Sequence, residues 1–293
     1  MNGIINLLKP PGMTSHHVVS ALRRLTGIRK IGHTGTLDPG AAGVLPICIG
    51  QATRVAEYVL TMDKTYRAEL TLGTATDTED AAGQVIDEKT VPPLDFNQVK
   101  TLLLDFTGPR QQIPPMYSAV RVHGQKLYQL ARRGETVTRK ARAINIYQLQ
   151  LLQLYPQKIL FDVSCSRGTY IRTLCREIAE ALDTVGHMSF LVRTRVGPYH
   201  LDQTYTLEEC ASLQAANELT TALLPLDSAL EQLLPYNVTA EDAEKIQNGR
   251  VLKFTDLPPE GTLMRVYGPG GELLAISSVE NSTVRPQKVF RSR

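Results

Sequence analysis

The chain has 293 residues, 42 % of them hydrophobic, which is enough for a sizeable core in one or two domains. Its formal net charge of +3 favours a polyanionic partner only weakly. The N-terminus lacks the pattern of a signal peptide, and no stretch approaches the roughly 20 uncharged apolar residues of a membrane span. We therefore expect a soluble, cytoplasmic protein with no membrane contact.

The first half of the chain alternates helical and strand-like patterns. A helix is predicted after Thr14 or Ser15 and ends at Gly27. The glycine-rich loop IGHTGTLDPGAAG then leads into the apolar strand VLPICIG. Further elements are predicted in this order: a helix over 51–60, a half-buried strand over 65–72, an acidic hairpin over 76–88 and a helix over 95–106.

The second half predicts strands over 117–122, 144–154, 159–166 and 187–196, with a helix over 170–182. Past about residue 235, a short helix and three strands are separated by Gly and Pro turns, which indicates a small β-rich module over 236–293. Strands and helices are interleaved without strict βαβ alternation. This order favours an α+β fold with a mixed, mostly antiparallel sheet flanked by helices.

The loop GHTGTLDPGAAGVL is the most informative segment. Its glycines permit backbone conformations that are closed to other residues. A lone Asp-Pro-Gly is usually only a turn, but Asp38 stands at the start of an apolar strand with His33 five residues before it. Neither the Walker pattern nor G-x-G-x-x-G is present, so a nucleotide phosphate loop is not expected.

The four cysteines form no C-x-x-C pair, and no histidine lies at a zinc-finger spacing from them. We expect four reduced thiols in a protein without a bound metal. They are Cys48, Cys165, Cys175 and Cys210.

Several motifs together resemble one enzyme family. LLKPPGMTSHHVV followed by GHTGTLDPGAAGVLPICIG closely resembles the bacterial tRNA pseudouridine-55 synthase family, often called TruB. KTYRAELTLG with TDTEDAAG, CSRGTYIRTLCREI and HMSFLVRTRVG resemble its later motifs in the same order, over roughly residues 1–200. The tail resembles, more weakly, the small RNA-binding PUA-type module that ends many such enzymes.

The resemblance implies a pseudouridine synthase catalytic domain over 1–235 and a PUA-like RNA-binding module over 236–293. It implies that Asp38 is the catalytic carboxylate, that Arg172 pairs with it, and that Tyr66 stacks on the target base. It also implies that Leu191 and Tyr170 line the uracil pocket and that His33 helps to hold the T-loop open. No cofactor and no metal is implied, which agrees with an isomerisation without net redox change.

These roles make physical sense, although each residue has a plainer interpretation. The base must leave its stack before its glycosidic bond can be reached. An aromatic face such as Tyr66 could receive it, unless Tyr66 is a core tyrosine. A guanidinium near Asp38 would favour the charged carboxylate. Arg172 could instead be a phosphate contact or a surface charge.

Segment 121–142 holds seven Lys or Arg residues and one Glu, with Tyr128 among them. This composition is typical of an RNA-binding insertion that follows phosphates, although a solvated face has the same appearance. The acidic segment 77–88 should lie away from RNA or pair with basic side chains.

The sequence thus predicts isomerisation of uridine to pseudouridine at position 55 in the T-loop of tRNA. The expected partner is the T-arm of tRNA, with no obligate protein partner and a monomeric chain. Two alternatives stay open: a guide-RNA-dependent pseudouridine synthase, and a tRNA-binding or tRNA-folding protein whose catalysis is secondary. An aspartyl-phosphate enzyme is disfavoured, because no second aspartate follows Asp38 by two residues.

Overall fold

The computed structural model describes residues 1–254 and 256–291. In this part of the chain, nine strands form one large sheet whose central path is β1-β3-β12-β4-β11-β10-β7. β12 and β3 pair in parallel, whereas the other pairs along this path are antiparallel. The strands are β1 (Gly3–Lys9), β2 (Ile31–His33), β3 (Ala42–Ile49), β4 (Lys64–Leu72), β7 (Gly108–Gln112), β10 (Arg142–Tyr155), β11 (Lys158–Cys165), β12 (Gly186–Val196) and β13 (Tyr199–His200).

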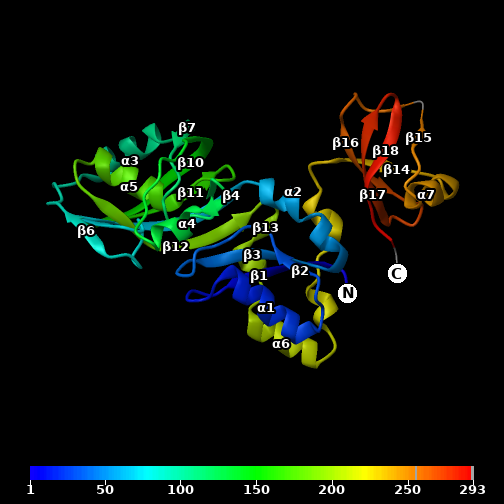
Figure 1. Cartoon of the computed structure of the whole chain (residues 1–293), viewed down its shortest axis with the longest axis horizontal. Helices are drawn as coiled ribbons and strands as arrows, with labels where there is room; N and C mark the ends of the chain where they lie inside the picture. Colours follow the sequence, from blue (N-terminus) through cyan, green and yellow to red (C-terminus); the bar gives the residue numbers. More distant parts are fainter. Residues whose placement is uncertain (255, 292–293) are drawn as a thin grey trace.

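Helices cover the two ends of this sheet separately (Figure 1). α1 (Ser15–Thr26) and α6 (Leu207–Ala215) lie by β1 and β3, whereas α3 (Phe96–Asp105) and α5 (Ile171–Ala181) cover the β4–β7 end. α1 begins and ends as predicted, because the Thr14 side chain accepts a hydrogen bond from the backbone N–H of His17 and Gly27 takes a left-handed conformation. The short elements η1 (Gly50–Arg54) and α2 (Ala56–Thr61) follow β3.

The main core lies between the sheet and the helices α3 and α5. β4 alternates in burial, with Ala68 and Leu70 facing this core together with Phe161 of β11. Burying each large apolar side chain contributes about 1.5–3 kcal/mol. This alternation fixes the register of β4 against β12, because a slip by one residue would turn its apolar face to water.

β3 and β12 approach each other unusually closely at Gly43. Gly43 has a φ of 114°, and a Cβ placed there would lie 2.2 Å from the carbonyl oxygen of Arg193. Only glycine fits this position. The close contact holds the two ends of the sheet together beside the loop that carries Asp38.

A second sheet forms the C-terminal β-rich module, in the order β14-β16-β17-β18-β15. Tyr267 donates a hydrogen bond of 2.7 Å to the carboxylate of Asp227, and Lys288 pairs with Glu57 of α2. These contacts dock the module on the rest of the chain (Figure 1). Its elements are β14 (Leu234–Asn237), α7 (Ala240–Gln247), β15 (Leu252–Lys253), β16 (Leu263–Tyr267), β17 (Leu273–Glu280) and β18 (Thr283–Val289).

The predicted fold class is confirmed: a mixed, mostly antiparallel sheet with helices, followed by a β-rich module. The acidic hairpin is present as β5 (Thr74–Thr76) and β6 (Val85–Glu88). The predicted helix over 51–60 is divided, because η1 ends at Arg54 and α2 begins at Ala56. Three further short elements, η2 (Leu201–Gln203), η3 (Leu219–Ala222) and η4 (Leu226–Ala229), lie between β13 and β14.

The predicted strand over 117–122 is wrong for most of its length. Only β8 (Arg121–Val122) is extended and paired, with β9 (Gln125–Lys126), before α4 (Leu127–Ala131). The carbonyls of Ser118 and Val120 accept the N–H groups of Tyr128 and Leu127, so they are not available to a neighbouring strand.

Candidate active site

Asp38 lies in the loop between β2 and β3, residues 34–41, here called the Asp38 loop. Ser15 of α1 accepts the N–H of Leu37 at 2.9 Å, just before the aspartate. Lys9 of β1 donates to the carbonyls of Pro39 at 3.2 Å and Ala41 at 2.7 Å, just after it. The backbone on both sides of Asp38 is therefore fixed by side chains of other elements.

Arg172 of α5 lies directly against Asp38. Its Nε is 3.0 Å from Oδ2, and its Nη2 donates to Oδ1 at 3.4 Å, so the contact is bidentate. The same guanidinium donates to the carbonyls of Thr78 at 3.0 Å and Tyr117 at 2.8 Å. The Arg172 side chain is 6 % exposed, which leaves it no route to a phosphate group.

The Asp38 side chain is 37 % exposed, so a substrate can reach the carboxylate. Burial raises the pKa of Asp38 above its usual value, and the guanidinium of Arg172 opposes this rise. Asp80 adds to the rise by repulsion, whereas Lys9 opposes it. Arg172 thus acts in the expected direction, but burial outweighs it.

Tyr66 and Leu191 lie on adjacent strands beside the Asp38 loop. Both belong to the buried cluster that also contains Leu37 and Ala41. Tyr66 of β4 is opposite Arg193 of β12, two residues after Leu191. Burial raises the pKa of the Tyr66 phenol. An aromatic and an aliphatic side chain are therefore placed close to the backbone that carries the carboxylate.

His33 and Tyr170 adjoin the segments that carry the ion pair: His33 lies just before the Asp38 loop, and Tyr170 lies just before α5, which carries Arg172. His33 ends β2, and its Nδ1 accepts the N–H of Gly35 at 3.4 Å. Burial, with Arg193 and His16 nearby, lowers the pKa of His33, which favours the neutral ring at pH 7. Tyr170 precedes α5, and its backbone N–H donates to the Gln112 side chain at 2.8 Å. Within the described residues, the recorded side-chain partner of Asp38 is Arg172, and neither ring forms a hydrogen bond with the carboxylate.

The acidic hairpin pairs with the basic face of α5. Glu79 accepts from Thr173 at 2.7 Å and from Arg176 at 3.0 Å. Asp80 lies 3.8 Å from Arg172. Of the two arrangements expected for this segment, pairing with basic side chains is therefore present. The hairpin also contacts Arg172, through Asp80 and the carbonyl of Thr78.

Sequence reasoning assigned no role to three buried cations near the site: Lys9, Lys64 and Arg193. Burial lowers the pKa of each lysine to about 8. Two patterns could have revealed Lys9 and Arg193. Lys9 ends the mostly apolar run GIINLLK, and Arg193 shares the inward side of β12 with Leu191 at a spacing of two.

All four cysteines are free, as expected, and all four are buried; burial raises the pKa of Cys48 and Cys165 to about 12. Within the described residues, no group of three His, Cys, Asp or Glu side chains could hold a metal ion. Nor does any helix of that part have the length and apolarity to cross a membrane.

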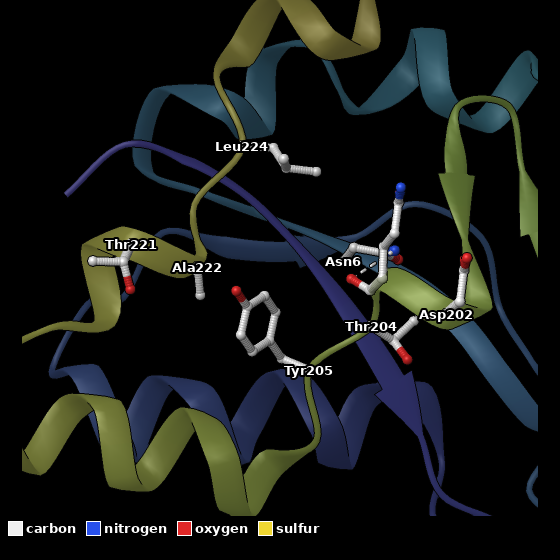
Figure 2. Close-up of a pocket in the computed structure, with 8 residues that line it drawn as sticks. Asn6, Asp202, Thr204, Tyr205, Thr221, Ala222 and Leu224 are labelled. Atoms are coloured by element: carbon white, nitrogen blue, oxygen red, sulfur yellow. Dashed lines mark hydrogen bonds between the residues drawn. The ribbon is translucent and has the colours of Figure 1, made fainter.

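A hollow of about 390 Å³ lies elsewhere, at the outer edge of β1 (Figure 2). Asn6 and Tyr205 line it together with Leu224. It contains none of the residues around Asp38, so it is no part of the candidate active site.

Comparisons with known proteins place the chain among described families. Residues 23–171 match the family model described as TruB family pseudouridylate synthase (N terminal domain), and residues 172–231 match the tRNA pseudouridylate synthase B C-terminal domain. The tRNA pseudouridine synthase B of Caldanaerobacter subterraneus subsp. tengcongensis is 41 % identical over 99 % of this chain and 99 % of its own length. That of Geobacillus thermodenitrificans is 43 % identical over 99 % of this chain and 100 % of its own length.

Two solved structures share the fold. The crystal structure of a Cbf5-Nop10-Gar1 complex matches with a TM-score of 0.77 and 27 % identity, over 99 % of this chain and 85 % of that chain. An H/ACA RNP bound to a substrate RNA containing 2'-deoxyuridine matches with a TM-score of 0.75 and 26 % identity, over 99 % and 86 %.

Proposed function

The chain belongs to the TruB family of pseudouridylate synthases, and we propose that it converts uridine to pseudouridine at position 55, in the T-loop of tRNA. The observation that carries this proposal is the reachable carboxylate of Asp38, held in a bidentate contact with the buried Arg172. Relatives named tRNA pseudouridine synthase B, which match along nearly the whole chain, support tRNA as the substrate.

The reaction breaks the bond from the sugar to N1 of uracil and joins the sugar to C5. N1 gains a proton and C5 loses one, so atoms and electrons balance without a cofactor or metal. The base must first leave its stack. Tyr66, Leu191 and Tyr170 would receive it, and stacking on an aromatic ring contributes about 1–3 kcal/mol. His33, at the start of the Asp38 loop, would help to hold the T-loop open.

Asp38 can act by attacking the sugar, by attacking the base or by removing a proton from the sugar. Each route requires the ionised carboxylate. Arg172 favours that form and fixes the direction of both oxygens, since its own position is set by the carbonyls of Thr78 and Tyr117. The fixed geometry means that little reorientation is needed when the base arrives.

RNA binding would use two further regions. In the insertion over 121–142, Lys126 and Arg132 lie 5.7 and 5.5 Å from the centre of the Tyr128 ring. This grouping of cations around an aromatic ring suits phosphate contacts and stacking. We also propose that residues 236–293 form a PUA-like RNA-binding module beside a catalytic domain over 1–235. The chain would act as a monomer in the cytoplasm, without an obligate protein partner.

The proposal is tested with purified protein and an unmodified tRNA transcript, by mapping pseudouridine at single-nucleotide resolution. Wild type should modify position 55 alone, whereas Asp38→Asn should form no product and bind tRNA within about tenfold of wild type. Turnover by Asp38→Asn would refute its catalytic role. Modification at another position, or at none, would refute the substrate assignment.

Two additions to this experiment separate the alternatives. A guide-RNA-dependent enzyme would leave the transcript unmodified until guide RNA and partner proteins were added. If folding of tRNA were the main role, Asp38→Asn would refold a misfolded transcript as well as wild type while forming no pseudouridine.

A further inference from the structure

Arg193 is the bulkiest fully buried side chain among the described residues, with 1 % exposure. It lies on β12, opposite Gly43 of β3 on one side and Tyr66 of β4 on the other. This is the place where the two ends of the large sheet meet. A charged side chain therefore occupies a position that a large apolar residue usually fills.

The contacts of Arg193 are with neutral groups. Its Nε donates to the carbonyl of Val44 at 2.7 Å, and its Nη2 donates to the carbonyl of Gly35 at 3.1 Å. The phenol of Tyr66 also lies beside the guanidinium. Within the described residues, no carboxylate oxygen approaches Arg193 to 4.0 Å. Arg172, by contrast, has Asp38 as its ionic partner.

Such a cation is costly to keep. An unpaired charge taken out of water loses several kcal/mol of hydration, and Lys9 and Lys64 repel Arg193 further. Burial lowers the pKa of Arg193, but a guanidinium stays charged at neutral pH. An uncharged side chain would avoid this cost. What the guanidinium offers in return is several N–H donors held in one rigid plane.

The two carbonyls that accept from Arg193 lie on either side of Asp38 in the chain. Gly35 lies at the start of the Asp38 loop, and Val44 lies in the strand that follows it. One guanidinium thus joins both sides of the loop to β12, the strand that carries Leu191. Gly35 also donates its N–H to the ring of His33, so the same peptide connects Arg193 with that histidine.

We propose that Arg193 is a positioning residue, which fixes the Asp38 loop against β12 and so sets the distance between the Asp38 carboxylate and the base pocket. It does not touch the substrate. This inference rests on the proposed function, because its effect is measured in pseudouridine formation.

The test compares Arg193→Lys and Arg193→Gln in the full chain by single-turnover rate, tRNA affinity and thermal unfolding. Lysine keeps the charge but cannot reach both carbonyls, and glutamine removes the charge. A displacement of about 1 Å at a reacting group costs roughly 100-fold in rate, so both variants should lose about that factor and keep tRNA affinity within about threefold. Arg193→Gln removes a buried charge but leaves at least one carbonyl without its donor, so its unfolding temperature should stay close to that of wild type.

Arg195→Lys is the matched control on the same strand, where the arginine is only half-buried and donates to Thr65 at 3.3 Å. Its rate should stay within about threefold of wild type. Wild-type rates in both Arg193 variants would overturn the proposal. So would unfolding of both variants, which would make Arg193 purely structural. Absence of product with the wild-type protein would instead refute the proposed function.

Discussion

Replacing Arg172 by lysine tests how much the forked contact with Asp38 contributes. The wild-type guanidinium makes two contacts with the carboxylate and donates to the carbonyls of Thr78 and Tyr117. A lysine ammonium keeps the charge but cannot span these acceptors. The carboxylate then loses its fixed direction, and at least one buried carbonyl loses its donor.

The magnitude follows from the geometry. A hydrogen bond between charged groups contributes about 1.5–3 kcal/mol, and the exposure of Asp38 places this pair near the lower value. Misplacement of the carboxylate adds roughly 100-fold, or about 2.7 kcal/mol. Together these losses amount to about 4 kcal/mol, which predicts a single-turnover rate lower by about a thousandfold.

The assay measures single-turnover pseudouridine formation and tRNA affinity over a range of salt concentrations. The Arg172 side chain is 6 % exposed, so affinity and its salt dependence should not change. If Arg172 were a phosphate contact, Arg172→Lys would keep the wild-type rate, and the charge-removing Arg172→Gln would lower the salt slope by about one unit; that result would refute our reasoning. Arg67→Lys is the control, because Arg67 forms an exposed pair with Asp162 at 2.8 Å.

Three further outcomes are expected. Burial raises the pKa of Asp38 and Arg172 opposes the rise, so activity should fall on the acid side as Asp38 is protonated. Arg172→Gln should move this acid limb of the rate-versus-pH profile to higher pH. An acid limb that did not move would contradict the pairing of Arg172 with Asp38. Burial lowers the pKa of Lys64 from its ordinary 10.5 to about 8, so at this group the unfolded state binds more protons than the folded state between these values. Lys64 should therefore make the free energy of unfolding rise with pH in this window by up to about 1.4 kcal/mol per unit, and denaturant titrations of Lys64→Met should lack that contribution. Gly43→Ala should lower the free energy of unfolding by about 3 kcal/mol or more in the same titrations, because its Cβ would lie 2.2 Å from the β12 backbone. Gly40→Ala is the control: a Cβ there has no atom within 4 Å, so the free energy of unfolding should change by less than about 0.5 kcal/mol.

Local patterns predicted many elements because their causes are local. The ends of α1 follow from Thr14 and Gly27, and the alternation in β4 follows from one buried face. The prediction failed over 117–122, where the backbone binds the start of the insertion instead of a strand. β1 was not predicted either, since a short, mostly apolar segment does not reveal that its partner is β3, some 40 residues later.

The sequence by itself determined the fold class, the β-rich module and the motif that contains Asp38. Only the tertiary structure decided that Arg172, 134 residues away, meets the carboxylate through two atoms. It alone decided that Lys9 and Arg193 are cations buried around the Asp38 loop. Helix caps and strand alternation depend on neighbours within a few residues, whereas desolvation and ion pairing depend on which distant segments the sheet brings together.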